Sequence, residues 1–166
     1  MIRYLLAGAA ALALCTSARA DMVAGWDVTP KPDADGICSA QYNYVDKDDG
    51  NAKNAVNFTF AKGKDGDTVI VMVFGYGKWE WDKGEKATAD LIVDDTVEHR
   101  AAKWEATDKV VLLGTFTGAE GLVKSIAGGK DIGLRFDGDK DNEAWFKIPN
   151  AGQAMGAVAI CRGQVK

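Results

Sequence analysis

Apolar residues alternate with polar ones along much of this chain, and that alternation constrains the fold more than any other feature. In the stretch NAVNFTFA, Val56, Phe58 and Phe60 share one parity while polar side chains take the other. A period of two residues predicts a strand with one buried and one solvent-facing side. The stretch TVIVMVF at 68–74 is instead apolar on both parities and rich in β-branched residues. It predicts a central strand that is covered on both faces.

Further strands follow from the same pattern, and turn residues separate them. We expect strands at 38–45, 78–81, 87–93, 98–105, 110–116, 132–136 and 144–148. The connections are rich in Asp, Gly and Asn, as in Asp48-Asp49-Gly50-Asn51 and in Asp94-Asp95, which is typical of hairpin turns.

Two stretches depart from the strand pattern. Residues 119–127 carry apolar side chains at helical spacing and precede Gly128-Gly129, a possible C-cap. Residues 151–161 fit a helix with Asn150 as its N-cap, although their last part would also suit a strand. We therefore expect residues 21–166 to form a single, mainly β domain. Its fold would be an antiparallel β-sandwich or partly open barrel with one or two short helices.

Residues 1–20 have the pattern of a signal peptide. Arg3 precedes an apolar run at 5–14, and Ala18-Arg19-Ala20 fits the rule for cleavage between small residues. The run is shorter than the roughly 17–25 residues that span a bilayer. We expect cleavage after Ala20, a periplasmic or secreted protein, and no transmembrane segment after cleavage. The alternative is lipidation at Cys15, as in a bacterial lipoprotein.

Cleavage would leave two cysteines, Cys38 and Cys161, close to opposite ends of the domain. Oxidising compartments favour their only possible pairing, so we expect one disulfide. Closing so long a loop stabilises a fold by about 4–5 kcal/mol in the loop-entropy description. The alternative is a reactive thiol, but the sequence contains no Cys-x-x-Cys motif.

Composition excludes several classes of protein. A hydrophobic fraction of 47% is too high for a disordered chain. A formal net charge of −4 argues against nucleic acid as a partner, because binding phosphates requires clustered Lys and Arg.

Catalytic and metal-binding patterns are incomplete. Beyond the leader the serines are Ser39 and Ser125, and neither lies in a nucleophile motif. His99 is the single histidine, which makes a zinc site improbable and suggests a solvent-facing strand residue. A triad of His99 with either serine is the alternative. We expect no catalytic residues, no metal and no cofactor.

The acidic run 137–143 begins like a calcium loop, with Asp at its first, third and fifth positions. The Gly required at the sixth position is Asn142, and the Glu required at the twelfth is Ile148. A tight hairpin turn is the better interpretation, and weak surface calcium binding is the alternative. A similar but weaker pattern contains Asp46, Asp48 and Asp49.

Aromatic residues gather beside a carboxylate at 76–81. Trp79 and Trp81 flank Glu80, so on a strand both indoles would project from one face, and Tyr76 lies just upstream. Exposed aromatics beside carboxylates can stack on sugar rings and accept hydrogen bonds from hydroxyls. The alternative is that the indoles belong to the core or its rim, since Trp buries a large area.

The order of elements also carries a resemblance to a family. Gly25-Trp26-Asp27-Val28 opens the domain, Leu91-Ile92-Val93-Asp94-Asp95 lies in the middle, and a short helix leads into Ile132-Gly133-Leu134-Arg135-Phe136. Ile148-Pro149-Asn150-Ala151-Gly152-Gln153-Ala154 then precedes the closing helix. This layout resembles the small exported β-proteins of the invasion-associated locus B type. The resemblance implies an exported, non-catalytic protein linked to the envelope or to host interaction. It supplies no catalytic residues.

These observations predict a non-enzymatic exported β-domain that binds a protein or a cell-envelope component. One alternative is recognition of a glycan or peptidoglycan through Tyr76, Trp79, Glu80 and Trp81. The other is inhibition of a secreted hydrolase.

Overall fold

The computed structural model describes residues 20–33, 35–63, 66–139 and 141–164. The predicted signal peptide lies outside the described residues except for Ala20, and so does the alternative lipidation site Cys15. Within the described ranges, no helix is both long enough and apolar enough to cross a membrane.

The described chain is mainly β, as the alternation predicts. Its elements are β1 (Asp21–Val23), β2 (Trp26–Val28), β3 (Cys38–Asp46), β4 (Ala52–Lys62), β5 (Thr68–Tyr76), β6 (Lys86–Val93), β7 (Thr96–Asp108), β8 (Val111–Thr117), α1 (Glu120–Gly128), β9 (Asp131–Phe136), β10 (Glu143–Lys147) and α2 (Ala151–Arg162). The short strands β1 and β2 are not predicted by the sequence, and the expected strand at 78–81 is absent from this order.

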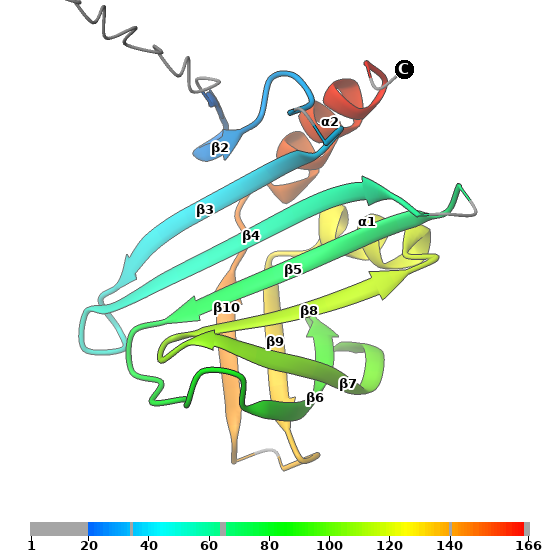
Figure 1. Ribbon diagram of the computed structural model, residues 1–166. Helices are drawn as coiled ribbons and strands as arrows, with labels where there is room; N and C mark the ends of the chain where they lie inside the picture. Colours follow the sequence, from blue (N-terminus) through cyan, green and yellow to red (C-terminus); the bar gives the residue numbers. More distant parts are fainter. Residues whose placement is uncertain (1–19, 34, 64–65, 140, 165–166) are drawn as a thin grey trace, which may run out of the picture.

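The strands form one antiparallel sheet of ten strands in the order β1-β2-β3-β4-β5-β8-β7-β6-β9-β10. The sheet curls, and β9 and β10 run behind β4, β5 and β8 in Figure 1. The rings of Phe74 in β5 and Phe146 in β10 lie 4.8 Å apart inside the curl. The backbone ladder does not close, which makes the fold a partly open barrel.

Alternation along the strands sorts the side chains as expected. Val56, Phe58 and Phe60 are at most 2% exposed and face the inside of the curled sheet. Trp104 from β7 packs edge-on against Phe74, with ring centroids 5.6 Å apart. The core is therefore built mainly from one face of the strands, although β6 buries the consecutive residues Leu91, Ile92 and Val93 and so has both faces covered there.

Both helices lie at one end of the sheet and contact each other (Figure 1). Cys161 on α2 is bonded to Cys38 on β3, with a Cα–Cα distance of 6.1 Å, which confirms the predicted disulfide. The Trp26 indole N–H donates to the carbonyl oxygen of Pro149 over 2.7 Å. These contacts hold α2 against the first strands, and the ambiguous stretch 151–161 is helical.

Asn150 occupies the N-cap position of α2 but does not cap it. Its φ of 56° is left-handed, and its side chain makes no capping hydrogen bond. The left-handed backbone turns the chain from β10 into the helix, a conformation that Asn tolerates better than most residues. Asn150 is therefore the N-cap residue, as predicted, but without a side-chain capping hydrogen bond.

Strand β5 is covered on one face only, so the expectation of two covered faces is also wrong. Ile70, Met72 and Phe74 are fully buried inside the sheet. Val69, Val71 and Val73 lie on the outer face and are half-buried. Neighbouring strands β4 and β8 shield the outer valines from the sides, which leaves these side chains partly exposed.

Candidate ligand-contact site

The segment that carries Trp79 and Trp81 is an irregular connection between β5 and β6, not a strand. The Trp79 N–H donates to the carbonyl oxygen of Tyr76 over 3.1 Å, which is turn geometry. The Trp81 N–H donates to the carbonyl oxygen of Lys109 over 2.9 Å, and Gly84 is fixed in the same way to Ala106. The segment thus runs against the β7–β8 hairpin, and its polar backbone groups are satisfied there.

Trp79 and Trp81 still come together, although not through strand geometry. Their ring centroids lie 6.1 Å apart at an interplanar angle of 68°. Trp79 also packs edge-on against Tyr76 at 5.6 Å, and Trp81 lies 5.7 Å from Phe136. Edge-to-face packing of this kind is the arrangement that aromatic quadrupoles favour. Both indoles are half-buried, so they belong to the rim of the core.

A depression of about 340 Å³ opens beside these indoles. We call it the aromatic depression, and its lining residues are Trp79, Trp81, Glu85, Lys86, Ala87, Thr88, Phe136, Asp137 and Asn142. One carboxylate oxygen of Glu85 accepts the backbone N–H of Asp82 over 2.9 Å, which fixes the orientation of the side chain. The indole N–H of Trp81 is buried and has no hydrogen-bond partner among the described residues.

Tyr76 and Glu80, the other two predicted contact residues, do not line the aromatic depression. Glu80 is exposed, and its carboxylate pairs with Lys109 at 3.2 Å. The Tyr76 hydroxyl donates to Asp49 over 2.6 Å, which raises the pKa of Tyr76 to about 12 and helps to lower the pKa of Asp49. Lys78 lies 2.5 Å from the other oxygen of the same carboxylate.

Three lining residues escape prediction because they come from the distant β9–β10 hairpin. Pairing of β6 with β9 places Phe136 opposite Ala89, and the Asp137 N–H then donates to the carbonyl oxygen of Thr88 over 3.2 Å. Asn142 follows in the same turn. The acidic run itself is the only sequence signal at this place, and it identifies a turn without showing what the turn faces.

The described residues 137–139 and 141–143 belong to the predicted hairpin connection between β9 and β10. The Phe136 N–H donates to the carbonyl oxygen of Asn142 over 2.9 Å, and the Asn142 N–H donates to that of Asp139 over 3.1 Å. Across the described part of the chain, no three His, Cys, Asp or Glu side chains are grouped so as to hold a metal ion.

The residues of the alternative catalytic triad lie on different elements and have other contacts. The Ser39 hydroxyl in β3 hydrogen-bonds to the Thr29 hydroxyl at 2.8 Å. Ser125 lies in α1. His99 is an exposed residue of β7, as predicted, and its ring packs 4.8 Å from that of Phe116.

Comparison with known proteins gives one structural similarity to report. No protein-family model and no curated protein matches the sequence. Among solved structures, the fold is similar to that of invasion associated protein B from Bartonella henselae, with a TM-score of 0.49 and 13% identical residues. The match covers 87% of this chain and 98% of that one. The layout resemblance that the sequence predicts is thus found again as a weak structural similarity.

Proposed function

We propose that this chain is an exported, non-enzymatic binding domain that contacts an uncharged glycan of the cell envelope at the aromatic depression. The observation that carries the proposal is the meeting of two half-buried indoles, the Phe136 ring and five polar side chains around about 340 Å³. Ligand sites commonly have this size and this mixture of aromatic walls and a few polar groups.

The aromatic part of the depression suits the apolar face of a sugar ring. Trp79 and Trp81 are held by their ring contacts and by the backbone bonds of their segment. Because the indoles are already fixed, binding would cost little side-chain entropy at these positions.

The polar part of the depression suits sugar hydroxyls. Glu85 and Asp137 offer carboxylate oxygens as acceptors, and the Asn142 amide both accepts and donates. The chain has a formal net charge of −4, so repulsion disfavours an anionic polysaccharide and favours a neutral glycan.

Export is supported by two independent features. Residues 1–20 have the composition of a secretory leader. The Cys38–Cys161 bond belongs to the kind of cross-link that persists in oxidising compartments. The incomplete set of catalytic residues in the sequence supports a role in binding.

Calorimetric titration of the purified protein with a soluble, uncharged glycan fragment, an oligomer of N-acetylglucosamine, tests the proposal. Asp137→Asn and Asn142→Ala alter rim groups that are exposed, so both variants should fold. Asp137 has a φ of 52°, and Asn tolerates that conformation. We expect Asn142→Ala to bind about tenfold more weakly, corresponding to the loss of one well-placed hydrogen bond. Asp137→Asn replaces a charged acceptor by a neutral one and should bind about fivefold more weakly.

Asn43→Ala is the matched control, because Asn43 is an exposed residue of β3 outside the aromatic depression. It should bind like the wild type. No heat of binding from the wild-type protein, or equal weakening by Asn43→Ala, would contradict the proposal.

A further inference from the structure

The outer face of four neighbouring strands carries no charged side chain over a wide area. We call it the uncharged face, and it consists of the odd-numbered residues of 39–45, 55–61, 69–75 and 111–117. None of these residues is Asp, Glu, Lys or Arg, although such residues make up 27% of the chain. Outward positions of a solvated antiparallel strand are usually polar and often charged. Depletion of charge on a surface is typical of the central part of a protein interface.

Strand β5 gives a second, independent sign that this face is covered. Its sequence is apolar on both parities, a pattern typical of strands buried on both sides. The inner residues Ile70, Met72 and Phe74 have their cover within the chain. The outer residues Val69, Val71 and Val73 are left half-buried. A second molecule packed on this face would bury them completely.

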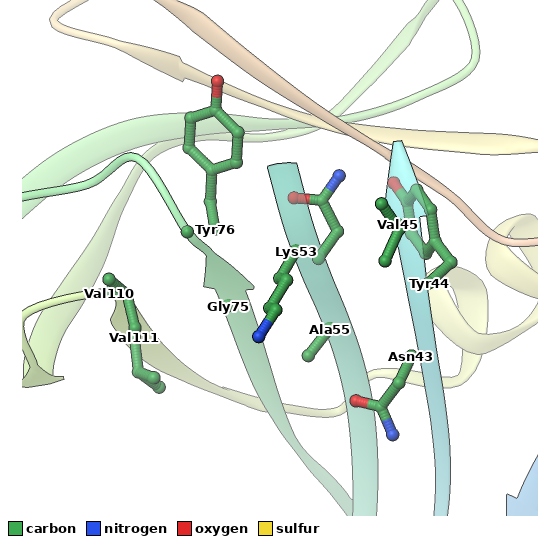
Figure 2. Close-up of a pocket in the computed structure, with 11 residues that line it drawn as sticks. Asn43, Tyr44, Val45, Lys53, Ala55, Gly75, Tyr76, Val110 and Val111 are labelled. Atoms are coloured by element: carbon green, nitrogen blue, oxygen red, sulfur yellow. The ribbon is translucent and has the colours of Figure 1, made fainter. Parts of the chain in front are cut away.

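The uncharged face has a groove, and a row of larger side chains lies beside it. Both run across the strands. Strand register places Asn43, Ala55, Gly75 and Val111 in one row. The residues of that row line a groove of about 510 Å³, which Lys53 also lines. Figure 2 shows Asn43, Ala55 and Val111 on one side of the strands and the Tyr76 ring on the other.

The next row has larger side chains and lies directly beside the groove; we call it the ridge. It contains Gln41, Asn57, Val73 and Leu113, again in register across the four strands. A two-fold axis lying in the contact plane between the two rows would bring the ridge of one copy over the groove of the other. Such self-complementarity is what an isologous interface requires.

We propose that the uncharged face is the contact surface between two copies of this chain. The inference goes beyond the proposed function, because none of the residues of the aromatic depression lies on this face. Two sheets would then pack face to face about 10 Å apart, as in a β-sandwich.

The size of the face fits a modest dimer. Strands about 4.8 Å apart and residues rising about 3.4 Å each give the face roughly 450 Å² of planar area per copy. Two copies would together cover about 900 Å², close to the ~1,000 Å² that a specific interface needs. The dimer should therefore form at micromolar rather than nanomolar concentration.

Charge favours a second copy over a charged partner. A basic or acidic protein would be recognised by side chains of opposite charge, and the uncharged face offers none. Lys53 lines one side of the groove, so a contact between two copies has to leave its ammonium group in water. The like net charge of −4 on the two copies opposes the contact at low salt.

Sedimentation velocity of the purified protein, from about 1 to 500 µM, tests the inference. We expect a reversible monomer–dimer equilibrium. Thr115→Lys puts a charge on the uncharged face at an exposed position and should weaken the dimer at least about tenfold. Ala55→Leu fills the groove without adding a charge and should also weaken it. Thr96→Lys is the matched control, since Thr96 is exposed at the start of β7, away from the face.

Melting curves confirm that each variant is folded before sedimentation is compared. A folded wild-type protein that remains monomeric over the whole range would overturn the inference. So would equal weakening by Thr115→Lys and Thr96→Lys. Binding of a monomeric wild type to vesicles of phosphatidylglycerol and phosphatidylethanolamine, or to a different protein only, would assign the face to another occupant and overturn it too.

Discussion

The backbone N–H of Lys147 donates to the Tyr44 hydroxyl over 2.9 Å and so links β10, at one end of the sheet order, to β3 near the other end. The Lys147 ammonium group also lies 3.4 Å from the Asp46 carboxylate, which raises the pKa of Lys147. Burial raises the pKa of Tyr44, so its hydroxyl stays protonated well above neutral pH. Side-chain contacts thus hold the two sides of the curled sheet together where no backbone ladder does.

Removing the Tyr44 hydroxyl should loosen this junction. Tyr44→Phe keeps the ring and deletes the acceptor for the Lys147 N–H, so we expect the free energy of unfolding to fall by about 1 kcal/mol in urea. Tyr42→Phe is the matched control, because Tyr42 lies on the same strand and its ring packs 5.3 Å from that of Tyr44. An unchanged stability of Tyr44→Phe would mean that the junction contributes nothing.

The Tyr76–Asp49 hydrogen bond predicts a late tyrosine titration. The Asp49 carboxylate accepts a hydrogen bond from the Tyr76 hydroxyl, and this bond raises the pKa of Tyr76 from 10.0 to about 12. The stabilisation linked to this shift is present below pH 10 and is lost as pH rises toward 12. Ultraviolet titration should show one late tyrosine that disappears in Tyr76→Phe and titrates earlier in Asp49→Asn. Asp48→Asn, the neighbouring control, should leave it unchanged.

The disulfide should account for a large share of the stability. Cys38 and Cys161 are separated by 123 residues, and removing the cross-link should cost about 4–5 kcal/mol in the loop-entropy description. Urea unfolding of the wild type and of the Cys38→Ala, Cys161→Ala double variant measures this loss. The untreated wild type should show no free thiol when denatured. A loss below about 1 kcal/mol would show that the cross-link is dispensable.

Two tryptophans should respond differently to the same substitution. Trp26 is fully buried and donates to Pro149, so Trp26→Phe leaves a cavity and an unpaired acceptor and should cost about 2–4 kcal/mol. Trp81→Phe removes a buried N–H that has no partner in the described structure, which offsets part of the lost packing. Its stability should stay within about 1 kcal/mol of the wild type. Equal losses in both variants would show that the Trp81 N–H is bonded.

Sequence patterns predict the strands best where one residue in two faces the core over several residues. The alternation at 56–60 and the β-branched run at 68–74 both lie in long strands. The strand predicted at 78–81 is wrong because the alternating indoles lie on an irregular segment. Both pack at the rim of the core, where Trp79 contacts the rings of Phe136 in β9 and Phe146 in β10. Strands β1 and β2 span three residues each, too few for a period to be recognised.

The two surfaces that matter most arise from register, which no single stretch of sequence contains. In the aromatic depression, Phe136 and Asn142 lie near Trp81 because β6 pairs with β9. The uncharged face becomes visible only when four strands are aligned row by row. The apolar character of both sides of β5 is the one trace of that face that the sequence reveals.

Heteronuclear NMR of the indole N–H groups during titration with a soluble, uncharged glycan fragment, an oligomer of N-acetylglucosamine, tests the central claim most directly. The chain has 5 Trp, so each resonance reports on one place in the fold. We predict that the signals of Trp79 and Trp81 shift progressively with added fragment, while those of Trp26, Trp104 and the exposed Trp145 stay in place. Five unmoved signals at a large excess of fragment, or a shift of Trp145 alone, would contradict recognition at the aromatic depression.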